Sequence, residues 1–135
     1  MTEKTIKISG KSVNMLYCAA TENGYEDISG KGIGIFVPTF GKDDDGNPII
    51  TKEAVATIGD YVMLAYAGII ASATRIQEEV PITVEEILYE ITPAERNILV
   101  TTIAELRNEW YGVPKVAASL IESEDSDKEE SGEKN

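Results

Sequence analysis

The chain has 135 residues, which suits one folded domain, and its apolar and charged fractions of 42% and 27% are ordinary for a globular protein. Twenty-four acidic residues, twelve basic ones and no histidine give a net charge of −12. This charge repels phosphate backbones and anionic lipids, so we expect no nucleic-acid partner and no membrane partner. A single cysteine excludes an internal disulfide, and the first residues carry no apolar export segment, so we expect a cytoplasmic protein.

Short strands are predicted at the start of the chain. Residues 5–9 alternate, with Ile6 and Ile8 on one face and Lys7 on the other, which is typical of a half-buried strand. Gly10-Lys11 then reads as a turn, and a second short strand follows over residues 12–14.

Residues 14–29 predict a helix, although they contain the turn dipeptide Asn23-Gly24. Apolar or small residues recur there at steps of three and four: Leu16, Tyr17, Ala20, Gly24 and Ile28. The segments CAATE and YEDIS beside the dipeptide are poor in β-branched residues, so we favour a helix over a hairpin. Gly30 stands where a left-handed residue would end this helix, and Cys18 is expected to be a small buried side chain within it.

A second strand region is expected over residues 33–40, IGIFVPTF, ended or kinked at Pro38. The apolar pair Ile49-Ile50 is a candidate partner for it in a second hairpin.

The sequence between these two pieces, GKDDDGNP over residues 41–48, resembles a calcium-binding loop only superficially. If Gly46 is the sixth loop residue, Gly41 and Lys52 occupy positions one and twelve, where carboxylates are required. We therefore expect a solvated turn and no metal site.

Residues 58–74 predict a central helix that is buried on most sides, because apolar residues occupy nearly all of its faces. Its uncharged run of fourteen residues, 61–74, is shorter than the roughly 20 that a membrane span needs. Its small residues would let another backbone approach closely: Ala67, Gly68, Ala71 and Ser72.

Two helix starts carry the capping-box spacing, Thr83 with Glu86 and Thr92 with Glu95. The apolar face predicted for the first helix consists of Val84, Ile87, Leu88 and Ile91. The face predicted for the second consists of Leu99, Ile103, Leu106 and Trp110, and this helix is expected to end before Gly112.

This order predicts an α+β fold that is mainly α, with a short N-terminal strand pair or hairpin followed by a compact bundle of about four helices. Residues 1–121 would form a single globular domain. Residues 122–135 hold seven acids, two lysines and no apolar side chain, so we expect a disordered acidic tail.

No catalytic set, cofactor site or metal site is predicted. Cys18 has no histidine to activate it, and the lack of histidine also excludes a Ser-His-Asp triad and the usual zinc sites. The pairs Glu78-Glu79 and Glu85-Glu86 lie beside helix starts, where interaction with the helix dipole explains them. We therefore expect a protein that is not an enzyme.

Candidate partner-binding residues lie at the exit of the last helix, where Trp110 and Tyr111 precede Gly112 and Val113. Aromatic side chains are enriched at interface anchors, so we assign Trp110, Tyr111 and Val113 to a partner-binding site. The alternative is that Trp110 closes the core and Tyr111 lies on its rim.

Three segments resemble a known family: YCAATENGYEDISGK, DYVMLAYAGIIASA and ITVEEILYEITPAERN. Together with the element order and the charged tail, they are similar to the core elements of the tail assembly chaperones of long-tailed bacteriophages, carried in phage or prophage genomes. The resemblance covers about residues 4–111. The segment IGIFVPTFGKDDDGNP is a departure from the family pattern.

The resemblance implies a protein that is not an enzyme, that binds the tape measure protein, keeps it soluble and helps to bring tail-tube subunits to it. It also implies a location in the host cytoplasm and absence from the mature virion. The alternative function is an acidic protein-binding module, or a nucleic-acid mimic that blocks a partner. The oligomeric state stays open.

Overall fold

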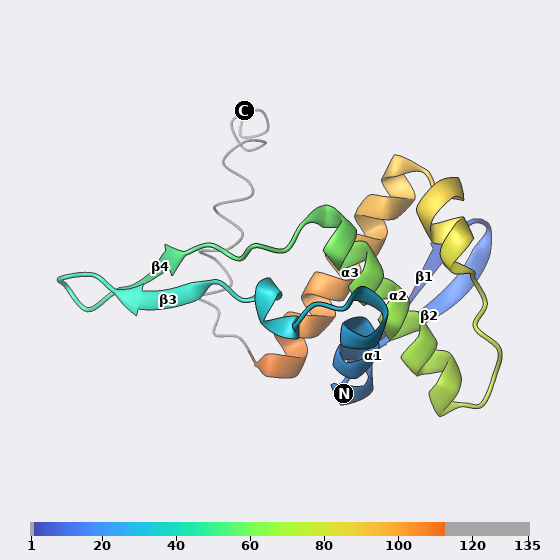
Figure 1. The fold of residues 1–135 in the computed structure, drawn as a ribbon, viewed down its shortest axis with the longest axis horizontal. Coiled ribbons are helices and arrows are strands. Elements are labelled where there is room, and N and C mark those ends of the chain that lie inside the picture. Colours follow the sequence, from blue (N-terminus) through green and yellow to red (C-terminus); the bar gives the residue numbers. More distant parts are fainter. Residues whose placement is uncertain (1, 113–135) are drawn as a thin grey trace.

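The computed structural model describes residues 2–112, and it is an α+β protein that is mainly helical, as predicted. Two strands come first and helices follow, with a second pair of strands inserted between the first two long helices (Figure 1). The end of the predicted domain, residues 113–121, and the predicted tail, residues 122–135, lie outside the described residues.

The first hairpin pairs β1 (Thr2–Ile8) with β2 (Lys11–Tyr17) in antiparallel register, Ile8 opposite Lys11. Its turn is Ser9-Gly10, one residue earlier than predicted, with φ angles of 54° and 75°. Two positive φ values are typical of a type I′ turn, whose twist matches that of the strands. The Ser9 amide donates to a carboxylate oxygen of Glu95 at 2.8 Å, so the turn is fixed to the last helix.

The predicted helix over residues 14–29 begins too early. Leu16 and Tyr17 belong to β2, and the helix α1 (Ala19–Ser29) starts only after Cys18. The alternation that marks the strand was missed: β2 buries Val13, Met15 and Tyr17 on one face, whereas the helical pattern used only Leu16 and Tyr17 of this strand.

Cys18 is therefore a half-buried N-terminal cap of α1 and not the fully buried side chain that we expected. The face of α1 turned to the core carries Thr21 and Tyr25, whereas Ile28 from the predicted face is exposed. Starting the helix five residues too early placed the predicted apolar face at the wrong angle.

The interpretation of Asn23-Gly24 as part of a helix is confirmed, since both lie within α1. Gly30 ends the helix as predicted, with φ 73° and its amide donating to the Glu26 carbonyl at 2.9 Å. Only glycine reaches this left-handed conformation without a steric penalty from Cβ.

The predicted strand over residues 33–40 is wrong except for residues 39 and 40. Residues Ile33–Phe36 form a 3₁₀ turn, η1, and β3 (Thr39–Lys42) begins only after Pro38. The cause is tertiary packing, because the turn directs the Phe36 ring between Tyr25 and Tyr61, at centroid distances of 5.0 and 4.9 Å. The second hairpin itself is confirmed, since β3 pairs antiparallel with β4 (Pro48–Lys52).

The helix α2 (Ile58–Arg75) is the central element, packed against α1, β2 and α3 (Figure 1). Its small residues give the close approach that we predicted. A Cβ added at Gly68 would lie 2.8 Å from the Leu16 carbonyl oxygen, 3.1 Å from Met15 and 3.2 Å from Ile103. The backbones of α2 and β2 therefore come nearer at Gly68 than any residue with a side chain permits.

The first capping box introduces only a short π-helical turn, η2 (Glu86–Glu90). Thr83 accepts from the Glu86 amide at 3.1 Å, and its own amide donates to the Glu86 carboxylate at 3.0 Å. Ile87 is buried as predicted, but Leu88 is 54% exposed. In a π turn, successive side chains are rotated by a smaller angle than in an α turn. The residues predicted from α-helical spacing therefore do not all lie on the buried face.

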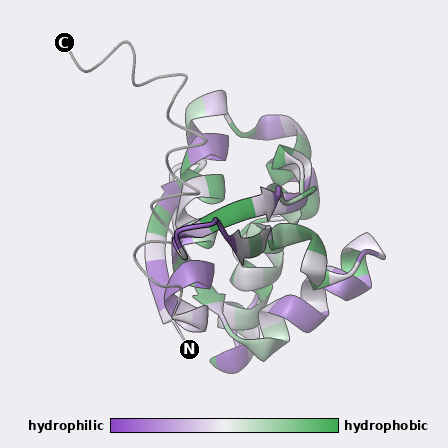
Figure 2. Cartoon of the chain, turned by 90° about the vertical axis from the view of Figure 1, so that its left-hand side faces the viewer, coloured by the Kyte–Doolittle hydropathy of each residue, from purple (hydrophilic) through white to green (hydrophobic). Residues whose placement is uncertain are grey.

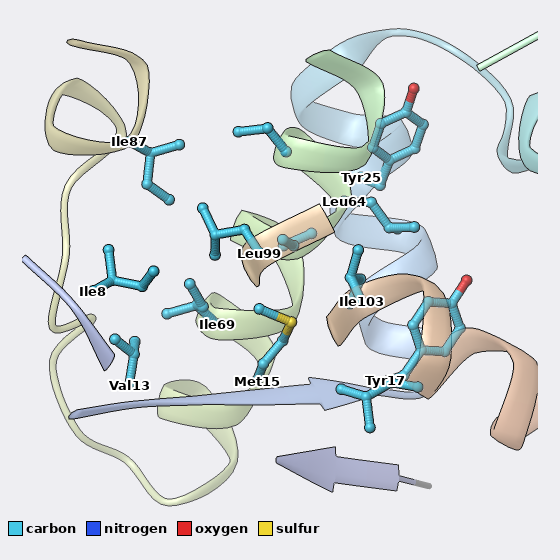
Figure 3. Packing of buried hydrophobic residues seen from close by; sticks show 14 of the residues in the cluster. Ile8, Val13, Met15, Tyr17, Tyr25, Leu64, Ile69, Ile87, Leu99 and Ile103 are labelled. Carbon is cyan, nitrogen blue, oxygen red and sulfur yellow. The ribbon is translucent and has the colours of Figure 1, made fainter. Parts of the chain in front are cut away.

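The last helix, α3 (Pro93–Tyr111), begins at Thr92 with the predicted capping box and ends at Gly112, whose φ is 63°. Leu99, Ile103 and Leu106 are fully buried, which confirms most of the predicted face. They meet residues of β2, α1 and α2 in one core, including Met15, Tyr25, Leu64 and Ile69 (Figure 3). Within residues 2–112, no helix is both long and apolar enough to cross a membrane.

Two glycines provide a matched test of the α2 packing. Gly68→Ala places a methyl group against a backbone carbonyl that cannot move alone, so we expect it to lower the free energy of unfolding by roughly 1–3 kcal/mol. At Gly24 an added Cβ would lie 3.6 Å from Ala67, an ordinary contact, so Gly24→Ala should stabilise by about 0.5–1 kcal/mol. Urea denaturation measures both, and equal effects of the two variants would contradict the close approach.

Candidate partner-binding site

The carboxyl end of α3 brings together five side chains, which we call the aromatic cluster: Tyr17, Glu22, Arg107, Trp110 and Tyr111. The three rings pack edge to face or tilted, with centroid distances of 5.5 Å from Tyr17 to Trp110 and 5.0 Å from Trp110 to Tyr111. Tyr17 and Tyr111 lie 6.5 Å apart. Such geometries stabilise aromatic pairs beyond their buried area.

Glu22 joins the two tyrosines, because the hydroxyls of Tyr17 and Tyr111 both donate to the same carboxylate oxygen. Burial, and then the hydrogen bond and the negative charge of Glu22, raise the pKa of both phenols. Both therefore stay protonated at neutral pH, and Glu22 fixes the orientation of their rings.

Arg107 lies beneath the exposed ring of the cluster. Its guanidinium carbon is 4.7 Å from the centroid of Tyr111, within the range of a cation–π interaction. Only 9% of the side chain is exposed, and its Nε has no hydrogen-bond partner among residues 2–112. A buried donor without an acceptor within the chain is costly.

The two predicted site residues that the structure describes lie side by side at the surface. Trp110 is half-buried and Tyr111 is 48% exposed, so Trp110 covers the core edge and Tyr111 forms the rim. Val113 lies outside the described residues.

The sequence did not single out Tyr17, Glu22 or Arg107 as members of this site. Arg107 and Tyr111 are four positions apart, a spacing that places two side chains on one helix face, and this signal was present in the sequence. No local signal links Tyr17 and Glu22 to α3, because that contact depends on the path of the whole chain.

The second exposed feature is the hairpin of β3 and β4, residues 39–52, which we call the arm. It projects from the body (Figure 1), and its two strands pack mainly on each other. Phe40 is 40% exposed, and Ile49 and Ile50 are only partly buried. Figure 2 looks along the arm and shows β4 largely in green beside a purple turn.

The turn of the arm is the predicted solvated turn. One carboxylate oxygen of Asp43 accepts from the amides of Asp45 and Asn47 at 2.9 and 2.8 Å. Asp43 thus closes the hairpin. Among residues 2–112, no group of three or more acidic, cysteine or histidine side chains is arranged to hold a metal ion.

The base of the arm is held by Asp60 at the start of α2. One of its oxygens accepts from the Tyr25 hydroxyl at 3.0 Å and from the Lys31 ammonium at 2.9 Å. The other accepts from the amide and hydroxyl of Thr57, at 2.9 and 3.0 Å. Asp60 therefore joins α1, the segment after it and the start of α2.

Burial raises the pKa of Asp60, but the hydrogen bonds from Thr57, Lys31 and Tyr25 outweigh this effect and lower it to about 2. Asp60 is therefore ionised at every physiological pH.

A small open cavity of about 110 Å³ lies between β2 and the end of α2. Ser12, Asn14, Ser72, Glu78 and Glu79 contribute its polar lining. Its volume accommodates only a few water molecules, and the Ser72 hydroxyl already donates to Glu3 at 2.8 Å.

Comparison of the chain with known protein families, with curated proteins and with solved structures finds no match. A function can therefore be inferred only from the residues and from the two exposed features, the aromatic cluster and the arm.

Asp60→Asn tests the electrostatic role of the carboxylate. Since its pKa falls from 3.8 to about 2 on folding, the charge contributes roughly 2 kcal/mol at pH 7, and this contribution is lost as the pH falls from about 4 to 2. We expect the variant to be less stable than the wild type by about that amount at pH 7, with the difference narrowing to near zero at pH 2.

The measurement is urea denaturation across this pH range. Asp27→Asn is the matched control, an exposed carboxylate on α1 whose loss should change stability by no more than about 0.5 kcal/mol. If the difference in unfolding free energy between Asp60→Asn and the wild type stayed the same at low pH, the stabilisation would come from the packing and hydrogen bonds of the Asp60 side chain and not from its charge.

Proposed function

We propose that the protein is an assembly chaperone, not an enzyme, of the kind that serves long-tailed bacteriophages. It binds the tape measure protein, keeps it soluble and helps to recruit tail-tube subunits. It acts in the host cytoplasm and leaves before the virion is complete. The aromatic cluster is the observation that carries the proposal, because it presents a rigid aromatic rim to solvent.

The chemistry of this cluster suits protein binding. Tryptophan, tyrosine and arginine dominate the binding energy of protein interfaces, and Trp110, Tyr111 and Arg107 lie within one turn of α3. Glu22 and Arg107 restrain the Tyr111 ring before any partner arrives, which reduces the entropy lost on binding.

The arrangement of the segments that resemble the chaperone family supports the same reading. Residues 17–31 supply α1, residues 60–73 supply most of α2, and residues 82–97 supply η2 and the start of α3. α1 packs on α2 and α2 on α3, so these segments form one body that carries the aromatic cluster at its edge. The arm is the chain's own addition to this body.

Co-expression with the tape measure protein of the same phage tests the proposal. We expect the wild-type chain to raise the soluble fraction of that protein and to co-purify with it. Tyr111→Ala removes the exposed ring and should weaken the complex roughly tenfold or more, as truncation of an interface anchor does. Trp110→Phe, which keeps the core contact with Tyr17, should give a smaller loss.

Tyr89→Ala is the matched control, because Tyr89 is 82% exposed on η2, away from the aromatic cluster. It should bind within about twofold of the wild type. Circular dichroism verifies that each variant is folded. A soluble fraction that does not respond to the wild-type chain, or a Tyr111→Ala variant that binds as the wild type does, would overturn the assignment.

The alternative, an acidic module that mimics nucleic acid, needs carboxylates that face outward. Several carboxylates of the described body bind groups of their own chain instead: Glu3 with Arg75, Glu86 with Lys11, and Asp60 with Lys31. We therefore expect a chain that lacks residues 122–135 to keep its affinity for the client. Complete loss of client binding in pull-down assays of this truncation would favour the mimic.

A further inference from the structure

Each of the two hairpins leaves strand edges open. Within residues 2–112, β1 pairs only with β2, and β3 only with β4. An isolated two-stranded hairpin is marginally stable in water, and unpaired edges are templates for a further strand. The first hairpin is supported by α2 and α3, whereas the strands of the arm pack mainly on each other.

The outer edge of β1 is placed to receive a strand. α2 packs on β2 and α3 packs mainly on β1, whose residue Ile8 lies among the core side chains (Figure 3). The exposed residues of β1 are Glu3, Lys4, Thr5 and Lys7. No described strand covers this edge.

The first hairpin is basic, and the turn of the arm is acidic. The first hairpin, residues 2–17, holds three lysines against one glutamate, in a chain whose net charge is −12. Lys4 pairs with Glu105 and Lys11 with Glu86, but Lys7 has no ion pair within the described residues. The turn of the arm presents three consecutive aspartates, residues 43–45.

An arm cannot reach the first hairpin of its own chain, because the two lie at opposite ends of the body (Figure 1). The matching surface is thus available only on another molecule. A second copy of this chain supplies both requirements at once, an open strand edge and a basic flank.

We propose that the arm of one copy adds to the outer edge of β1 in a second copy. The added strands extend a two-stranded sheet to four, and main-chain hydrogen bonds supply the contact. Asp44 and Asp45 of the turn lie near Lys7 of the second copy and set the register. Asp43 takes no part, since its carboxylate closes the turn.

This contact joins two different surfaces, so it forms either a reciprocal pair, in which each arm adds to the other copy, or a ring or chain of copies. It needs no client protein. Its test therefore uses the full purified chain alone, and its outcome is independent of the proposed chaperone role.

Sedimentation velocity and light scattering of the wild-type chain should show a mass that rises with protein concentration. High salt should weaken the association, because it screens the exposed charges. Lys7→Glu should weaken it roughly tenfold, and so should Asp44→Lys combined with Asp45→Lys, because each replaces attraction by repulsion. Combining Lys7→Glu with the two aspartate reversals should restore most of the wild-type affinity.

Asp27→Lys is the matched control, an exposed charge reversal on α1 that should leave the association within about twofold of the wild type. A further variant replaces residues 39–52 by a short Gly-Ser linker and should be monomeric. A wild-type chain that is monomeric at every concentration would overturn the proposal. Association of the arm-deleted chain at wild-type strength, or combined reversals that restore nothing, would do the same.

Discussion

The contact of α2 with β2 at Gly68 determines the geometry of the whole body. The Leu16 carbonyl oxygen lies only 2.8 Å from the position that a Cβ of residue 68 would take, so the helix packs closely on the strand backbone. Met15 and Ile103 close in around the same point. Because the two backbones are this close, side chains of α1 and α3 fill the space on either side of α2. These side chains form most of the rest of the core.

This packing also determines where the two exposed features lie. The direction of β2 across α2 carries its last residue, Tyr17, to the end of α3, where it meets Trp110 and Tyr111. At its own start, α2 presents Asp60 to Tyr25 and Lys31, and this anchors the segment from which the arm leaves. α2 therefore supports β2, which carries Tyr17 to the aromatic cluster, and supplies Asp60 to the segments that flank the arm.

Features with local causes could be predicted from the sequence. The stop at Gly30, the capping box at Thr92 and the apolar α2 each depend on residues within one or two turns of the chain. The features that could not be predicted from the sequence depend on contacts between residues far apart in the chain. Phe36 turns inward because two tyrosines distant in sequence receive its ring, and Leu16 and Tyr17 join a strand because β1 and α2 lie beside them.

The same distinction applies to the candidate site. Trp110 and Tyr111 could be recognised as exposed anchors at a helix exit, but their orientation depends on Glu22, which comes from a different helix. Helical spacing relates only residues of the same helix. It cannot reveal the hydrogen bond from the Tyr111 hydroxyl to the Glu22 carboxylate, because the connections between the helices bring these two residues together.

The net charge of −12 opposes indiscriminate association through the exposed apolar groups. Long-range repulsion acts between any two copies and weakens contacts that lack charge complementarity. A basic first hairpin and an acidic arm turn form a local exception to this repulsion. The general charge therefore opposes non-specific contacts of Phe40 and Tyr111, and the association that we propose depends on the local charges.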